Sequence, residues 1–109
     1  MVSRDELARL AQQEPARLLA LLRGGELTAA GLTYGAEYAG RFITDGEAVR
    51  PVLIALLFHK SAVVREGAVM GLSWHVTPLV RVMLEEVAQH DTSDGVRATA
   101  GDVLAEVGP

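Results

Sequence analysis

A short sequence pattern occurs three times at a constant spacing, and this repetition constrains the fold more than any other feature of the chain. Each copy begins with leucine or valine and ends with alanine, and the copies lie at residues 32–36, 64–68 and 96–100. Consecutive copies are 32 residues apart. Self-similarity at a fixed period of roughly 20–50 residues is typical of repeat proteins, whose units stack in a row. The sequence therefore predicts an array of similar units, which offers a partner a surface instead of one closed pocket.

The units are predicted to be helical. Apolar residues recur at helical spacing along almost the whole chain, and no segment alternates with the period of a strand. We expect six or seven helices in pairs, at about residues 4–13, 16–23, 28–43, 47–59, 62–75, 78–90 and 94–107. Ser3 with Glu6 predicts a capping box in front of the first helix, and Thr44 with Glu47 predicts another in front of the fourth.

Length and composition favour one small domain. The 109 residues, half of them hydrophobic, are expected to form a single domain of three units at about 3–43, 44–76 and 77–108. Cysteine is absent, so neither disulfides nor a thiolate metal site is expected. The first residues lack the pattern of a signal peptide, and no hydrophobic run reaches the roughly 18 residues of a membrane span. We expect a soluble cytoplasmic protein without a membrane partner.

The charge of the chain argues against nucleic acid as a partner. Nucleic-acid-binding proteins usually carry a basic face, because neutralised phosphates supply much of the affinity. Here 14 Asp and Glu outnumber 10 Lys and Arg, and the net charge is −4. A local basic stripe is the remaining alternative, and its members would be Arg9, Arg17, Arg23 and Arg41.

The paired helices resemble HEAT repeats. Residues 51–57 form an apolar first helix, and after a short turn a second helix carries the pair Val64 and Arg65, followed by small residues up to Leu72. The third unit is similar, with Val96 and Arg97 at the matching positions. The resemblance implies an all-α fold, a short right-handed α-solenoid of about three HEAT-like helical hairpins. It covers roughly residues 15–107.

The resemblance also implies a ladder of polar contacts between units. In HEAT proteins an aspartate in the turn and an arginine in the second helix link neighbouring repeats. Asp91 and Arg97 match these positions and are candidates for one rung, and Arg65 holds the arginine position of the preceding unit. The chain departs from the family pattern at His59, which replaces the aspartate of the second unit, and the first unit has neither residue.

The partner-binding residues are expected on the second helices, which line the concave face of such an array. Met70 and Trp74 are four residues apart and therefore share one face of their helix. The candidate binding residues over the three units are Tyr34, Tyr38, Arg41, Glu66, Met70, Trp74, Asp102 and Glu106. Tyrosine and tryptophan are common anchors of protein interfaces. The alternative is that these aromatic side chains fill gaps between glycine-rich helices.

The chain shows no constellation typical of catalysis. His59, His75 and His90 each end a predicted helix, where a histidine interacts favourably with the last carbonyl groups. The glycine pair at 24–25 is not followed by the lysine of a phosphate-binding loop. We therefore expect no cofactor, no bound metal and no enzymatic activity.

Three functions are compatible with these features. The first is a non-catalytic protein-binding module, a scaffold or adaptor, which could also form a homodimer through a terminal repeat or the concave face. The alternative is a small acidic regulator or inhibitor of another protein or of a nucleic-acid enzyme, acting by charge mimicry through Asp94, Asp102 and Glu106. A HEAT-type lyase or a ligand-binding subunit is a third possibility, which an enclosed apolar pocket would support.

Overall fold

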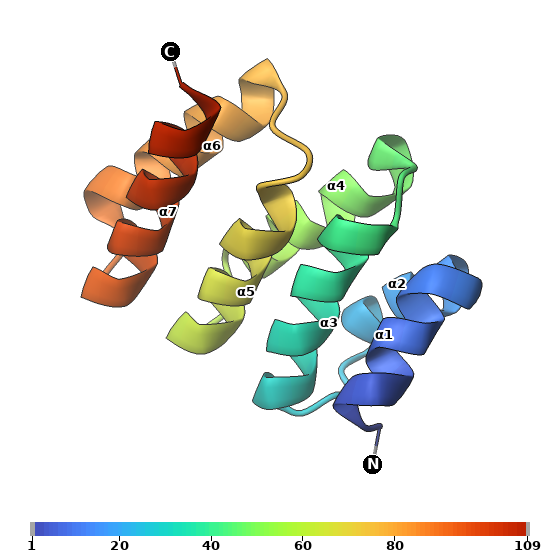
Figure 1. The fold of residues 1–109 in the computed structure, drawn as a ribbon. Coiled ribbons are helices and arrows are strands. Elements are labelled where there is room, and N and C mark those ends of the chain that lie inside the picture. Colours follow the sequence, from blue (N-terminus) through green and yellow to red (C-terminus); the bar gives the residue numbers. More distant parts are fainter. Residues whose placement is uncertain (1, 109) are drawn as a thin grey trace.

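The computed structural model describes residues 2–108, and within them it contains helices and no strand. The helices are α1 (Arg4–Gln13), α2 (Pro15–Gly24), α3 (Ala29–Phe42), α4 (Gly46–Leu56), α5 (Ala62–Leu72), α6 (Pro78–His90) and α7 (Asp94–Val107). The hairpins α2–α3, α4–α5 and α6–α7 stack in a row, and α1 lies beside α3 (Figure 1). The predicted all-α solenoid is confirmed.

The helices form two layers. In Figure 1, α1, α3, α5 and α7 lie side by side in front, and α2, α4 and α6 lie behind them. The front layer is tightest between α3 and α5, where the backbones touch without intervening side chains. A Cβ atom on Gly67 would lie only 2.7 Å from the carbonyl oxygen of Thr33, and a Cβ on Gly40 would overlap the backbone of Gly71. Glycine is therefore required along this contact.

Equivalent residues occupy equivalent surroundings in the three hairpins. Ala36, Ala68 and Ala100 are all fully buried, as are Val64 and Val96 one turn before them. A single hydrophobic core runs through all seven helices, built mainly from leucine, valine and alanine. The 32-residue period therefore reports real structural equivalence: the small alanine side chain fits where consecutive second helices approach one another.

Hydroxyl and carboxylate caps set most of the helix starts. The Ser3 hydroxyl accepts a hydrogen bond from the Glu6 N–H at 3.1 Å, which is one half of the predicted capping box, while the Glu6 carboxylate pairs with Arg9 instead. The predicted cap at Thr44 is wrong, because the N-cap of α4 is the next residue, Asp45. The Asp45 carboxylate takes that role and accepts from the Ala48 N–H at 3.2 Å.

Two helices end three residues earlier than the sequence predicts. α4 stops at Leu56 and α5 at Leu72. The residues that follow continue in tight turns, in which the N–H groups of His59 and His75 donate to carbonyl groups three residues back. Apolar periodicity persists through these turns, and for that reason it could not mark the helix ends.

Candidate functional site

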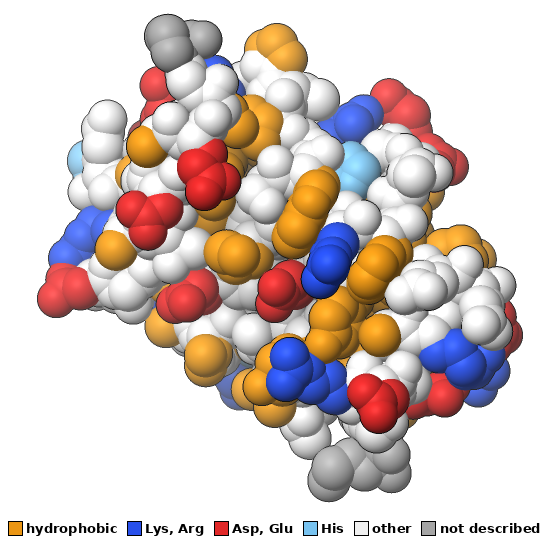
Figure 2. Space-filling model, viewed as in Figure 1, with side chains coloured by type: hydrophobic (Ala, Val, Ile, Leu, Met, Phe, Trp, Pro, Cys, Tyr) orange, Lys and Arg blue, Asp and Glu red, His pale blue; other side chains and the backbone are white. Residues whose placement is uncertain are grey.

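The candidate binding residues lie on the front layer, on a surface that we call the open face. It comprises Tyr34, Tyr38, Arg41, Glu66, Met70, Trp74, Asp102 and Glu106. Figure 2 shows this side of the molecule, with hydrophobic side chains along α3 and α5, basic side chains near α1 and α3, and acidic side chains over α7. The charge of the open face therefore changes sign from α3 to α7.

The two tyrosines pack against their own molecule. The rings of Tyr34 and Tyr38 stack along α3 with centroids 6.5 Å apart, and Phe42 extends the row at 6.2 Å from Tyr38. Arg4 of α1 covers this row: its guanidinium carbon lies 4.4 Å from the centre of the Tyr34 ring, and its Nε donates to the Tyr38 hydroxyl at 2.7 Å. Both tyrosines are half-buried, so only part of each side chain is accessible to a partner.

Trp74 is the exposed aromatic residue of the open face. It lies two residues after the end of α5, and 47% of its surface is exposed. With Arg41 of α3 it borders a shallow hollow of about 310 Å³, next to the His75 ring. The Nε2 atom of His75 lies 2.8 Å from the carbonyl oxygen of Gly40, so this ring ties the end of α5 to α3. Trp74 thus adjoins a residue that anchors the end of α5 to α3, and about half of its own surface is exposed.

A second hollow of about 260 Å³ lies between side chains of α5 and α7. Met70 and Ser73 form its α5 side, and Val103 lies on the α7 side. Asp102 and Glu106 border it one helical turn apart, and both are exposed. Neither carboxylate takes part in an ion pair with any residue in the range 2–108. The hollow therefore combines an apolar interior with two free negative charges.

Glu66 occupies a less accessible position than its neighbours. Its side chain is half-buried, and its carboxylate lies close to Gly95 in the first turn of α7. A carboxylate near a helix N-terminus interacts favourably with the helix dipole. Glu66 therefore helps to join α5 to α7, in addition to any contact with a partner.

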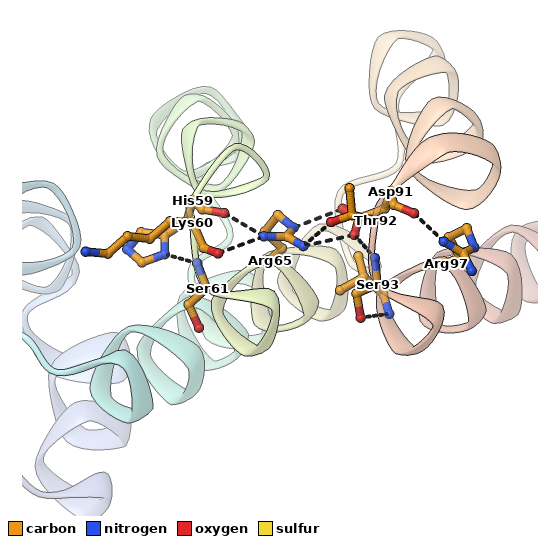
Figure 3. A network of polar contacts seen from close by, with 9 residues as sticks. His59, Lys60, Ser61, Arg65, Asp91, Thr92, Ser93 and Arg97 are labelled. Carbon is orange, nitrogen blue, oxygen red and sulfur yellow. Dashed lines mark hydrogen bonds and ion pairs between the residues drawn. The ribbon is translucent and has the colours of Figure 1, made fainter.

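An ion pair links the second and third hairpins at one end of the array (Figure 3). The Arg65 guanidinium donates to both carboxylate oxygens of Asp91, with Nε–Oδ2 at 2.9 Å and Nη2–Oδ1 at 3.0 Å. The two side chains are only 13% and 8% exposed. Arg65 also donates to the carbonyl oxygen of His59 at 2.9 Å. One arginine thus connects the turn before α5 to the turn before α7.

This rung differs from the one expected. The Asp91 carboxylate does not pair with Arg97, because the aspartate points back to the preceding hairpin. Arg97 instead donates to the backbone carbonyl of Asp91 and pairs with Asp94. Burial by itself would raise the pKa of the Asp91 carboxyl, but the hydrogen bonds from Arg65 and the Ser93 N–H hold it below its ordinary value.

His59 performs the local task of the missing aspartate. Its Nδ1 accepts a hydrogen bond from the Ser61 N–H at 3.0 Å, just as the Asp91 carboxylate accepts from the Ser93 N–H at 2.9 Å. His59 precedes Asp91 by 32 residues, and Ser61 precedes Ser93 by the same interval. This structural role was not predicted from the sequence, although the repeat period was a signal that could have revealed it.

Three further observations concern metal binding, buried polar groups and membrane-spanning segments. Residues 2–108 contain no cluster of three or more acidic or histidine side chains able to hold a metal ion. Over the same range, every buried side-chain nitrogen or oxygen has a hydrogen-bond partner. None of the described helices is both long and apolar enough to span a membrane.

These features define a helical repeat protein of stacked hairpins with one polar rung between units. A family model described as HEAT repeats matches residues 34–105, which is more than half of the chain. The chain therefore belongs to the HEAT-repeat family. No curated protein and no solved structure matches it.

Proposed function

We propose that this protein is a non-catalytic protein-binding module, a scaffold or adaptor that holds a segment of another protein across its open face. The observation that carries the proposal is the position of Trp74. It lines the hollow beside Arg41, it directly follows Ser73, which lines the second hollow, and 47% of its surface is exposed. Exposed tryptophan is a frequent centre of binding energy in protein interfaces.

The charges beside Trp74 limit the kind of segment that fits. Arg41 is exposed on the α3 side, whereas Asp102 and Glu106 are exposed and unpaired on the α7 side. A segment with an apolar side chain over Trp74, a basic group over α7 and an acidic group over α3 would meet opposite charges at both ends. Complementary charges of this kind set the orientation of a partner and suppress wrong partners.

Truncation of the aromatic side chain tests the proposal. As the probe we would use a peptide selected from a phage-displayed random library against the wild-type protein, with its dissociation constant measured by calorimetry. Trp74→Ala should weaken binding by about thirtyfold, the loss typical of a hot-spot tryptophan. Leu79→Ala on α6, which removes another exposed hydrophobic side chain from the rear layer, is the matched control. Equal affinities of the wild type and Trp74→Ala would contradict the proposal.

Charge mimicry is a second candidate, and the free carboxylates of Asp102 and Glu106 support it. Asp94, the third member of the expected acidic set, pairs with Arg97 and contributes less. In a mimicry mode, affinity would fall steeply between low and high salt, because exposed charges are screened within about 10 Å at 0.1 M ionic strength. Binding centred on Trp74 would change much less with salt.

The cytoplasmic location remains a prediction from the sequence.

A further inference from the structure

The rear layer contains the same groove twice, once between α2 and α4 and once between α4 and α6. The first is lined by Leu22, Arg23, Pro51, Val52, Ala55 and Leu56, among others. The second is lined by Leu57, Phe58, Val82, Met83, Glu86 and Val87. Taken in order, each residue of the first list has its repeat equivalent in the second. The offset is 35 residues for Leu22 and Arg23, and 31 residues for the other four.

The second groove differs from the first at the residue that stands at its edge. Arg23 holds this place in the first groove, whereas Phe58 holds it in the second and is 77% exposed. The opposite wall is also unusually apolar: Val82 is 60% exposed, and Leu79, one turn before it on α6, is 63% exposed. Exposed hydrophobic side chains gathered in one place indicate an interaction surface.

We propose that this groove is the interface of a homodimer, in which Phe58 of each copy enters the groove of the other. A twofold contact joins the same patch on both copies, so the patch must complement itself. Here a protruding aromatic side chain and an apolar hollow of about 220 Å³ lie side by side on one surface. A twofold axis beside Phe58 therefore buries both rings at once.

The charges beside the groove complement each other across the same axis. Lys60, the only lysine of the chain, is exposed two residues after Phe58. Glu86 lines the far wall of the groove, and Glu85 beside it is also exposed. When Phe58 enters the groove of the second copy, Lys60 follows it toward these carboxylates, and symmetry makes the contact twice. The first groove has no such arrangement, because Arg23 replaces the aromatic residue.

The patch is small, so the dimer is expected to be reversible, with a dissociation constant in the micromolar range. Interfaces that bury less area than a standard protein complex are typically weak and transient. The groove is lined by the end of α4 and by α6, which lie behind α5 and α7 (Figure 1), so dimerisation leaves the open face of each copy accessible. The dimer would therefore be bivalent toward a partner, and its formation does not depend on the proposed binding function.

Sedimentation velocity between about 1 µM and about 1 mM protein tests the proposal. The wild type should shift from monomer to dimer over this range, and Phe58→Lys should remain a monomer throughout. Because Phe58 is exposed, the substitution costs little packing, and the circular dichroism spectrum and melting temperature should stay unchanged. Val82→Lys is a second variant with the same expected result. Trp74→Ala, which removes an exposed aromatic side chain from the other layer, should still dimerise.

A charge exchange distinguishes the proposed twofold dimer from nonspecific association through hydrophobic surface. Lys60→Glu and Glu86→Lys should each raise the dissociation constant, and the double variant should restore it toward the wild-type value. A wild-type chain that stays monomeric at the highest concentration would overturn the proposal and leave the groove to a different protein. Dimers of Phe58→Lys, or a double variant weaker than both single variants, would overturn it too.

Discussion

Asp91 stabilises the fold in two ways at once, through the ion pair with Arg65 and through the hydrogen bond from the Ser93 N–H. The first interaction joins two hairpins, and the second fixes the turn before α7. Because both partners in the ion pair are nearly buried, removal of the carboxylate would leave the Arg65 charge without compensation in a poorly solvated place.

Substitution of Asp91 should separate these two contributions. Asp91→Ala loses both and should lower the free energy of unfolding by about 2–3 kcal/mol, the range for hydrogen bonds to charged groups. Asp91→Asn keeps one oxygen for the Ser93 N–H and should lose less. Urea denaturation at neutral pH measures both values. Arg97→Met, which touches only the Asp91 carbonyl and Asp94, is the comparison, and a larger loss there than in Asp91→Ala would contradict the assigned rung.

The same carboxylate should make stability depend on pH. Its pKa is lower in the folded state than the value of about 3.9 for an aspartate in the unfolded chain. The unfolded chain thus takes up the proton first, and the contribution of Asp91 is present above pH 4 and declines as the pH falls through the folded-state pKa. The stability difference between wild type and Asp91→Asn should therefore shrink below about pH 4. A constant difference between pH 7 and about pH 3 would be evidence against this pair.

At the scale of the helices, the contact between α3 and α5 depends on glycine more than on side-chain interlocking. Gly40 of α3 meets the backbone of Gly71 of α5, and Gly67 meets the backbone of Thr33. Gly101 of α7 has a different environment: a Cβ built there finds no atom within 4 Å. The chain thus offers a matched pair of helical glycines, one enclosed and one open.

Alanine at these two positions should have opposite effects. Gly40→Ala forces α3 away from α5 and should destabilise the protein by about 1–3 kcal/mol, as overpacking does. Gly101→Ala gains helix propensity without a clash and should stabilise it by about 0.5–1 kcal/mol. Thermal unfolding followed by circular dichroism gives both values. If both variants melted at the same temperature, the close approach of α3 and α5 would not hold in solution.

At the scale of the whole molecule, the repeat period predicted the architecture because stacking places residues 32 apart in the same surroundings. Ala36, Ala68 and Ala100 confirm this directly. The repeat period does not predict how α1 packs, because α1 has no equivalent in the later units. For that reason the cover that Arg4 provides over Tyr34 and Tyr38 could not be anticipated from the repeat.

The remaining errors have a common physical cause. A sequence pattern identifies which residues share a face, but the direction of a polar side chain depends on neighbours that only the folded chain provides. Asp91 turned to Arg65 and not to Arg97 because the carboxylate faces the preceding hairpin. The groove beside Phe58 was missed for the same reason, since its two walls come from helices that are separated by α5 in the chain.

The third hairpin is attached to the array unevenly. The first two hairpins are joined mainly in the front layer, where the backbones of α3 and α5 touch at Gly40 and Gly71. The third is joined mainly through α5 with α7 and through Arg65, and α7 has no glycine in such close backbone contact with α5. Bending stiffness is therefore lower at this joint than at the other. A load on the array would be absorbed there first, by a tilt of α6 and α7 that changes the width of the hollow between Met70 and Asp102.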